Sequence, residues 1–401
     1  MKYNIDKLLE SGNKSLLDNI TPGKEVEQSL KERRKEIREV IRQAFREVAS
    51  VLDQDNRGWS VDDSLIPTDV AERIRTLDAS GKAELKKLKP KFKTQGSFVY
   101  QTMNLPCHDK QQLDLDDGVY LPIEVMRHQP IVSKQLFFEI VDAALAIYAN
   151  RKGYKFIGSK PTCARIEISN SMHIDIPLYA IPKDQYMRFL ETYDQAALKG
   201  LNKREAYLES DEVYLARRDE EHWVKSDPMQ INDWFEAEKS KYPKRLVRTC
   251  RFFKAWRDYT WTAGGPSSIT LMASVVNTFN DHDGFDSLSE AILICSKELK
   301  QQLAEGVPSP IEGESNLFPR NGMKGEEING TIEKATEFAR TVKKALEFSH
   351  TKGECNSEAR TVFGSRLPYT PDDIEQVLSQ KIRETPAKVV PQEDTPNMDA
   401  G

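Results

Sequence analysis

The chain has 401 residues, which suggests two or three domains or one large elaborated unit. With 38% apolar and 30% charged residues we expect a soluble chain that can bury a core, and the net charge of −5 excludes a general nucleic-acid coat protein. The five cysteines are dispersed and never spaced as C-x-x-C, which argues against a zinc site and a disulfide framework and favours a reducing, cytoplasmic compartment. The start lacks an apolar signal core and no run approaches 18 apolar residues, so we expect neither secretion nor a membrane span.

A long amphipathic helix is predicted between Pro22 and Leu52. Its apolar residues recur at three-to-four spacing, with one longer step, and mark one buried face: Val26, Leu30, Ile37, Ile41, Phe45, Val48 and Leu52. The polar face carries five arginines, which we interpret as a solvated surface: Arg33, Arg34, Arg38, Arg42 and Arg46. Residues 53–90 are polar and broken, with a short helix expected over 68–78.

Three aspartates within four positions follow a Gly-Ser turn. If residues 112–123 form a strand, Asp114 and Asp116 project from one face and their apolar neighbours from the other. Two carboxylates so close repel, and each tends to take up a proton, unless a cation lies between them. Asp117 falls on the opposite side, and we interpret it as a turn residue.

A candidate for a third carboxylate follows an apolar helix predicted over 132–148. Residues 163–169 and 172–181 have the alternation of a β-hairpin with a short turn between them. In the second arm, His173 and Asp175 fall on one face. Asp175 is therefore the best candidate for the third ligand, whereas we expect His173 to be a structural histidine.

The second half of the chain is predicted to be helical. Residues 184–228 are charged and are interpreted as an insertion or linker. The helical pattern begins at Asp233 and includes 245–259 and 267–279, separated by a Gly-Gly-Pro break. Judged from its helix alone, Lys254 would be solvent-exposed.

Strands in the first half and helices in the second predict an α+β fold of two lobes around a ligand-binding cleft. The last segment contains three prolines and little to bury, which favours a mobile tail. The expected parts are a long helix within 1–52 that braces the lobes, a catalytic core over 53–230 with the charged insertion, a helical domain over 231–383, and the tail over 384–401.

Asp114, Asp116 and Asp175 together suit Mg²⁺, which prefers carboxylate, phosphate and water oxygens. Two ions side by side would activate an attacking hydroxyl and neutralise a leaving group, and Mn²⁺ could substitute for them. Upstream, Gly96 and Ser97 at a helix start would offer backbone N–H groups and a hydroxyl to phosphate oxygens. The combination predicts a metal site that works on phosphates.

Three segments carry a resemblance to a known family: "TQGSFVYQTMN…DLDDGVYLP", "TCARIEI…HIDIPLYAIPK" and "CRFFKAWRDYTWTAGGPSSITLMA". In order and spacing they resemble the bacterial cGAS/DncV-like nucleotidyltransferases, and within that family the cyclic GMP-AMP synthases of anti-phage (CBASS) operons. The likeness runs from about residue 25 to about residue 320. It implies a polymerase-β-like nucleotidyltransferase core joined to a helical domain, with two NTPs bound in the cleft.

The resemblance also implies roles for individual residues. Asp114, Asp116 and Asp175 would be the catalytic, metal-binding triad. The donor triphosphate would be held by Ser97, Lys254 and Ser268, with Gln95, Gly96 and Ser267 beside them in the nucleotide site. The bases and the acceptor nucleotide would be contacted by Tyr100, Thr162, Arg165 and Glu314.

Structural alternatives remain open for three of these residues. Tyr100 could equally be a core aromatic. Ser268 follows a chain break and is a natural helix cap or first-turn residue. Arg165 could pair with nearby acidic residues instead of a nucleotide.

The resemblance makes template-independent synthesis of a cyclic dinucleotide the expected activity, with 3′,3′-cyclic GMP-AMP from ATP and GTP as the first candidate product and pyrophosphate as the by-product. The alternatives are a linear nucleotidyltransferase and a non-catalytic nucleotide sensor, and no basic track suggests long nucleic acid as a partner. Implied partners are an effector that the cyclic dinucleotide activates and an E1–E2-like enzyme that conjugates the chain through its terminal Gly401.

Overall fold

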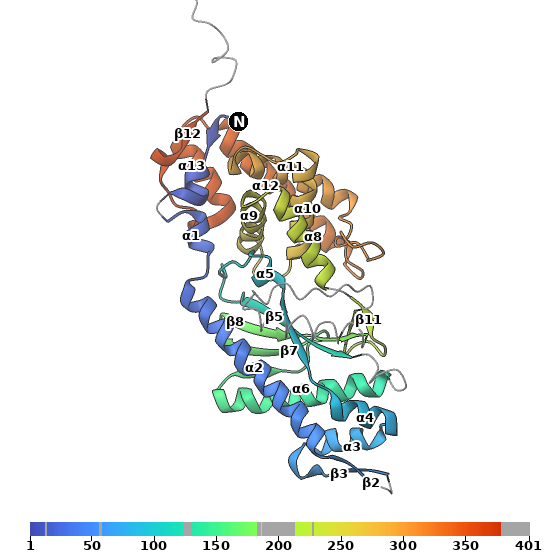
Figure 1. Ribbon diagram of the computed structural model, residues 1–401. Helices are drawn as coiled ribbons and strands as arrows, with labels where there is room; N and C mark the ends of the chain where they lie inside the picture. The colour runs from blue at the N-terminus through green and yellow to red at the C-terminus, as the bar shows by residue number, and fades with distance from the viewer. Residues whose placement is uncertain are drawn as a thin grey trace, which may run out of the picture.

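The computed structural model describes residues 1–12, 14–55, 58–122, 130–182, 186, 213–226 and 228–377. They form two lobes stacked along one axis, a lobe built on a β-sheet and a lobe built of helices (Figure 1). The main sheet lies in one lobe together with its covering helices, and the second half of the described chain is mostly helical, which confirms the predicted α+β class. Of the charged segment predicted over 184–228, residues 184–185, 187–212 and 227 lie outside the described residues, as do the tail beyond residue 377 and Gly401.

The sheet of the first lobe has eight strands in the order β11-β10-β9-β5-β8-β7-β6, and β4 also pairs with β5. Their bounds are β4 Lys91–Gln95, β5 Leu113–Pro122, β6 Lys155–Ile157, β7 Ala164–Ser169, β8 Met172–Ile176, β9 Leu178–Ile181, β10 Tyr214–Leu215 and β11 Val224–Lys225. β5 runs parallel to both β8 and β9, and the other pairs are antiparallel. The expected hairpin is confirmed as β7–β8. β10 and β11 extend the sheet, so part of the segment interpreted as insertion belongs to the sheet lobe.

Helices pack against the face of the sheet that carries Leu113, Leu115, Val119 and Leu121. They are α2 Lys24–Ser50 and α6 Pro130–Lys152, and two shorter helices pack against these in turn, α3 Thr68–Thr76 on α6 and α4 Ala79–Lys87 on α2 (Figure 1). A β-hairpin of β2 Leu52–Asp55 and β3 Gly58–Val61, followed by the turn η2 Asp63–Leu65, completes this lobe. Five of the seven apolar positions predicted for the long helix are buried on α2 and Leu52 follows on β2, because spacing of three to four keeps them on one face.

The helical lobe contains α8 Pro228–Lys241, α9 Arg245–Thr260, α10 Ser268–Asp281, α11 Leu288–Glu305, α12 Gly325–Lys343 and α13 Lys352–Phe363. Shorter turns are η5 Lys344–Phe348, η6 Gly364–Arg366 and η7 Pro371–Asp373. The start of the chain also belongs here, as β1 Tyr3–Asn4, η1 Lys7–Ser11 and α1 Leu16–Ile20. β1 pairs with β12 Glu375–Gln376, so the two ends of the described chain meet in this lobe (Figure 1).

The first 50 residues therefore connect the two lobes. Leu8, Leu9 and Leu16 are buried in the helical core, whereas Ile37 and Phe45 of α2 are buried against the sheet. No helix of the described residues is both long and apolar enough to cross a lipid bilayer.

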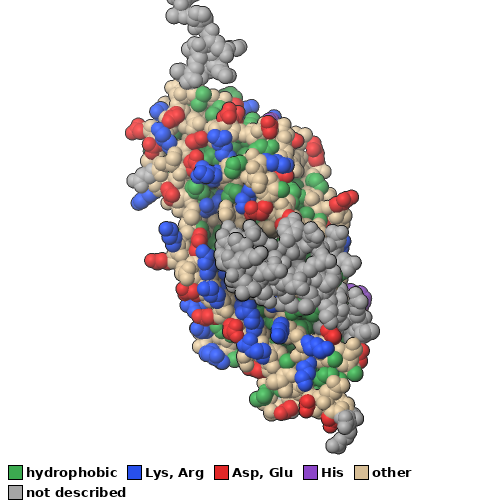
Figure 2. All heavy atoms as spheres, in the orientation of Figure 1, with side chains coloured by type: hydrophobic (Ala, Val, Ile, Leu, Met, Phe, Trp, Pro, Cys, Tyr) green, Lys and Arg blue, Asp and Glu red, His purple; other side chains and the backbone are tan. Residues whose placement is uncertain are grey.

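The polar face of α2 corrects one expectation. Figure 2 shows Lys and Arg side chains gathered along the line that α2 follows in Figure 1, but they are not all solvated. Arg38 donates to both carboxylate oxygens of Asp117, at 2.6 and 2.5 Å, and to Thr94. Asp117 is 1% exposed and lies within β5, so its interpretation as a turn residue is wrong, although its assignment to the opposite face from Asp116 is confirmed. An internal ion pair thus fastens α2 to the strand that carries the candidate metal ligands.

Candidate active site

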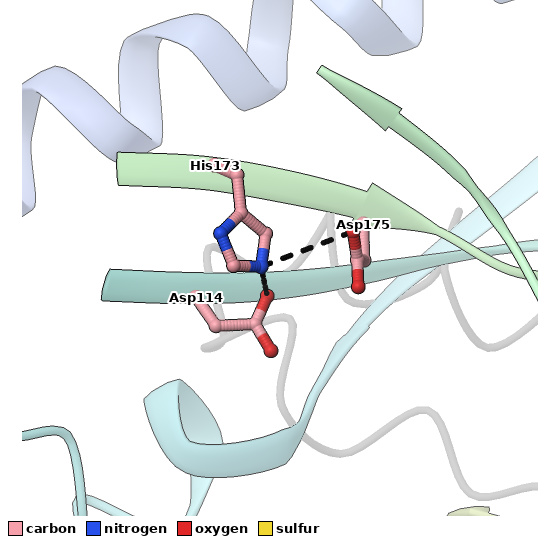
Figure 3. Close-up of side chains that lie close together, drawn as sticks. All are labelled: Asp114, His173 and Asp175. Carbon is pink, nitrogen blue, oxygen red and sulfur yellow. Dashed lines mark ion pairs between the residues drawn. The ribbon is translucent and has the colours of Figure 1, made fainter. Parts of the chain in front are cut away.

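Parallel pairing of β5 with β8 assembles the candidate site. Asp114 lies opposite His173 and Asp116 opposite Asp175, so all four side chains project from the same face of the sheet. In Figure 3, Asp114 from β5 and His173 and Asp175 from β8 point into one space. Nε2 of His173 lies 3.0 Å from Oδ1 of Asp114 and 3.9 Å from Oδ1 of Asp175. The predicted placement of three carboxylates on one face is confirmed.

The three carboxylates interact through their charges. Burial and the neighbouring carboxylates of Asp114 and Asp175 raise the pKa of Asp116 well above its ordinary value. Arg165 and Lys254 oppose this shift without cancelling it. Without a bound cation, burial and charge repulsion thus favour proton uptake by Asp116, as the close spacing of the aspartates predicted.

Arg165 binds Asp175 through both of its carboxylate oxygens. Nε of Arg165 donates to Oδ1 at 2.6 Å and Nη2 donates to Oδ2 at 2.7 Å. The two residues face each other across the β7–β8 pair. The structure therefore places Arg165 against an acidic side chain, which was the alternative to contact with an acceptor nucleotide.

His173 lies inside the cluster, although the sequence favoured a structural role. Its Nδ1 lies 3.0 Å from Oε1 of Gln112, an arrangement in which Nδ1 carries the proton. Its Nε2 and Oδ1 of Asp114 are buried, and neither makes a well-aligned hydrogen bond among the described residues despite their proximity. A neutral His173 would thus direct an unshared electron pair at the carboxylates.

This donor set fits a divalent cation. Asp114, His173 and Asp175 each offer one ligand atom, and these atoms lie within 4.8 Å of one another. Two of the atoms, on Asp114 and His173, are the buried groups without an aligned partner. Asp116 lies outside this tightest group, but its carboxylate is close enough to the others for their charges to raise its pKa, and an adjacent cation would lower that pKa again.

Gly96 is the first residue of the short helix α5, Gly96–Val99, and lies beside the carboxylate of Asp116. Its φ of +67° is a left-handed conformation that glycine adopts without strain. A Cβ atom at this position would overlap Oδ2 of Asp116 and lie 3.2 Å from Cγ. Gly96 therefore lets the backbone of α5 and the strand carboxylate approach each other, and the expected helix start at the Gly-Ser pair is confirmed.

Lys254 is buried in α9 rather than exposed, so the expectation from its helix alone is wrong. Its side chain is 5% exposed, and Nζ donates to the backbone carbonyl of Thr102 at 2.5 Å. Burial, with a further contribution from Arg257, lowers the pKa of Lys254 to about 8. The segment just after α5 therefore holds a cation that can lose its proton near neutral pH.

Both halves of the chain match family models. Residues 90–179 match the nucleotidyltransferase domain described as cyclic GMP-AMP synthase DncV-like, and residues 243–375 match the cyclic GMP-AMP synthase C-terminal domain. A cyclic GMP-AMP synthase of Vibrio cholerae is 33% identical over 406 residues, which cover 92% of this chain and 92% of that protein. The chain belongs to the cGAS/DncV-like nucleotidyltransferases. It is therefore an enzyme of the family that contains cyclic dinucleotide synthases.

Further members of the family agree in sequence and in structure. A cyclic GMP-AMP synthase of Escherichia coli is 35% identical over 317 residues, which cover 75% of this chain and 73% of that protein. Vibrio cholerae DncV, solved with the linear intermediate 5′ pppA(3′,5′)pG, matches with a TM-score of 0.81 and 31% identity over 94% of this chain and all of that one. A DncV mutant solved with ATP and GTP matches with a TM-score of 0.80 at 31% identity.

Several residues that the resemblance placed in the nucleotide site have structural partners in this DncV-like chain. Gln95 is buried and donates to the hydroxyl of Tyr120 at 2.6 Å, while the hydroxyl of Tyr179 donates to it at 3.1 Å. Tyr100 is 8% exposed and packs edge-on against Phe235, with ring centroids 5.8 Å apart. Tyr100 is thus a core aromatic in this structure, as the structural alternative proposed.

The two serines at the start of α10 have different roles. Ser267 caps the helix, because its hydroxyl accepts a hydrogen bond from the backbone N–H of Thr270 at 3.1 Å. Ser268 is the first helical residue, and its hydroxyl accepts a hydrogen bond from Arg257 at 2.9 Å. Arg257 is a cation beside this serine that the sequence did not single out, although its place three residues after Lys254 puts both on one side of α9.

The remaining candidates are not brought into the cluster. Thr162 is half-buried in the bend before β7, close to the buried thiol of Cys163, whose pKa burial and Asp175 raise to about 12. Glu314 is exposed in the loop between α11 and α12, where its carboxylate accepts a hydrogen bond from Ser309 at 2.8 Å.

Proposed function

We propose that this chain makes a cyclic dinucleotide from two NTPs, with 3′,3′-cyclic GMP-AMP from ATP and GTP as the product and pyrophosphate as the leaving group. The observation that carries the proposal is the cluster of Asp114, Asp116 and Asp175 on one face of β5 and β8. The pKa of Asp116 is raised there, and a bound cation would lower it by stabilising the ionised carboxylates. The names of the relatives support the choice of product. DncV itself has been solved with ATP and GTP and with a linear pppApG intermediate.

The chain's own residues would bind and orient the reactants. The backbone at Gly96 and Ser97 lies beside Asp116 and would hold the donor phosphates where the carboxylates can reach their metal ions. Lys254, one segment away, would supply positive charge to the departing pyrophosphate. Asp175 would take the proton of the attacking ribose hydroxyl once Arg165 has moved to a phosphate.

Two Mg²⁺ ions would be held by Asp114, Asp116 and Asp175, and when bound they would lower the pKa of the attacking hydroxyl and neutralise charge on the phosphates. Mn²⁺ could replace them, because it also prefers carboxylate oxygens. The first attack gives a linear dinucleotide triphosphate. Rebinding of that intermediate in the same site and a second attack, with loss of a second pyrophosphate, closes the ring.

The test is to incubate the purified full chain with labelled ATP and GTP and Mg²⁺, and then to treat the products with phosphatase. Because a ring has no terminal phosphate, a phosphatase-resistant small product is expected only when both nucleotides are present. A phosphatase-sensitive product would instead indicate a linear nucleotidyltransferase, and no product would favour a non-catalytic sensor.

A matched pair of double variants assigns the activity to the cluster. Asp114→Asn with Asp116→Asn should abolish pyrophosphate release. Asp53→Asn with Asp55→Asn removes the same D-x-D charge pattern from the exposed hairpin of β2 and should leave the rate unchanged. Turnover by the first variant at the wild-type rate would reject the metal-site assignment.

We further propose that the product is a second messenger in cytoplasmic anti-phage defence, where it activates an effector. Cells that carry the operon should lose protection against phage with the Asp114/Asp116 double variant and keep it with the Asp53/Asp55 variant. We also propose conjugation through Gly401 by an E1–E2-like enzyme. Deletion of the last two residues should abolish the conjugate and leave the isolated synthase activity unchanged, whereas persistent conjugates would reject this attachment site.

A further inference from the structure

A cavity of about 390 Å³ is lined by residues of α1, α8 and α9, by the connection between α8 and α9, and by Gln101 just after α5. Its wall carries four cationic side chains and, among the described residues, no acidic one: Lys239, Lys244, Arg248 and Arg251. The rest of the wall is mainly apolar and comes from Leu17, Pro243 and Val247. None of these residues belongs to the carboxylate cluster, so the cavity is a second candidate binding site.

Two of the four cations have partners of opposite charge. Lys239 pairs with Glu236 at 2.7 Å, and Arg248 pairs with Glu10. Arg251 instead donates to neutral oxygens, at 3.0 Å to Asn104 and at 2.9 Å to the hydroxyl of Thr21.

Arg251 and Lys244 make no ion pair within 4.0 Å among the described residues. Burial lowers the pKa of Arg251 to about 10, which shows that its charge is poorly solvated. Glu27 attracts the charge of Arg251 without forming an ion pair, so the wall keeps two cations, Lys244 and Arg251, that have no ion-pair partner among the described residues. The buried one of the two, Arg251, favours an anion beside it.

The backbone at the wall is strained at two positions. Gln101, which lines the cavity, has a φ of +61°, and Lys244 has a φ of +67°. Left-handed conformations cost non-glycine residues about 1–2 kcal/mol each. Such strain tends to collect at binding and switch sites, and here two of the four strained non-glycine residues of the described chain line the same cavity.

We propose that this cavity binds a small organic phosphate, with the phosphoryl group among Lys244, Arg248 and Arg251 and an apolar body against Leu17 and Val247. Arginine and lysine donors match phosphate oxygens in charge and geometry. The volume lies within the range of small-molecule pockets, which are usually apolar with a few placed polar groups.

A ligand here would contact two segments that also reach the active site. Gln101 directly follows Tyr100 and α5, whose first residue lies against Asp116. Arg251 precedes Lys254 by one turn of α9, and Lys254 donates to the carbonyl of Thr102. Occupancy of the cavity should therefore change the rate of nucleotide turnover. This expected change rests on the proposed function, whereas binding of the phosphate to the cavity is independent of it.

The binding test is calorimetric titration of the full chain with phenyl phosphate in EDTA, which removes metal-dependent binding at the active site. We expect saturable 1:1 binding with a Kd of about 1 mM or tighter. Lys244→Glu with Arg248→Glu should weaken binding at least about tenfold, because two attractive charges become repulsive. Lys297→Glu with Lys300→Glu makes the same charge change on α11, away from the cavity, and should have no effect.

Further variants keep the result interpretable. If the double variant unfolds, Lys244→Glu alone serves, because Lys244 is exposed and its carbonyl rather than its side chain starts α9. No saturable binding, or equal binding by the cavity and α11 variants, would overturn the proposal. So would a loss of binding confined to Lys254→Met, since that places the probe in the active site. Binding without any change in turnover would overturn the proposed coupling between the cavity and the active site, but not the binding site itself.

Discussion

Replacing Gly96 by alanine should damage catalysis much more than stability. The left-handed φ of +67° costs an alanine about 1–2 kcal/mol of unfolding free energy. The added Cβ would also overlap Oδ2 of Asp116, where ordinary contact begins at 3.4 Å. Because the carboxylate or the α5 backbone must move by about 1 Å, and such displacements cost about 100-fold in rate, we expect roughly that loss of pyrophosphate release.

A second glycine provides the control. Gly153, at the turn after α6, has a φ of +70°, and a Cβ there would meet nothing within 4 Å. Gly153→Ala should therefore lose a similar unfolding free energy in urea titrations and keep the wild-type rate of pyrophosphate release from ATP and GTP. If Gly96→Ala and Gly153→Ala turn over within about threefold of each other, contact with Asp116 does not position the site, and the reasoning fails.

Three shorter predictions concern charge. Asp117→Ala leaves the Arg38 guanidinium without its buried partner and should lower the unfolding free energy, measured by urea titration, by about 3–5 kcal/mol. Arg46→Ala on the exposed side of α2 should cost about 1 kcal/mol or less in the same titration. Equal losses in the two variants would contradict the internal role of the Arg38–Asp117 pair. In EDTA, Asp116→Asn should stabilise the fold, because the raised pKa of Asp116 means that its ionisation opposes folding. The gain in unfolding free energy should grow as pH rises from about 3.9 through the raised pKa. A difference in thermal unfolding between variant and wild type that does not change with pH would contradict this prediction. ATP binding near pH 8 should be accompanied by proton uptake, because the phosphate charge raises the pKa of Lys254 from about 8. Calorimetry in two buffers of different ionisation enthalpy measures this uptake. If Lys254→Arg takes up as many protons as the wild type, the protons bind to another group.

The carboxylate cluster could be predicted because it depends on local periodicity. In a strand every second side chain shares a face, so Asp114 with Asp116, and His173 with Asp175, could each be paired from the sequence. The register between the two strands brings these pairs together and is a tertiary property, yet two carboxylates on the first strand and one on the second made their meeting the simplest expectation. His173 was correctly placed on this face, but no local pattern indicated that its Nε2 lies 3.0 Å from Oδ1 of Asp114.

The errors have a common physical cause, which is packing between elements distant in sequence. The burial of Lys254 depends on the segment around Thr102, 152 residues earlier. Asp117 is an internal ion-pair partner only because Arg38 of α2 crosses behind β5, 79 residues away. Helical or strand periodicity tells which face a side chain occupies, but it cannot tell what covers that face.

The cations of the site are held with different strengths, and this difference orders the binding events. Lys254 donates to a neutral carbonyl, so an arriving triphosphate offers it a stronger, charged acceptor. Arg165 already has a bidentate carboxylate partner in Asp175, and this pair is stronger than a single new contact with a phosphate. A cation on Asp175 would face the Arg165 guanidinium at close range, so Arg165 must leave before Asp175 can serve a metal ion or accept a proton. In the proposed mechanism, a metal ion on Asp114 and Asp116 and a phosphate for the guanidinium would together release Arg165, which would couple nucleotide binding to completion of the metal site.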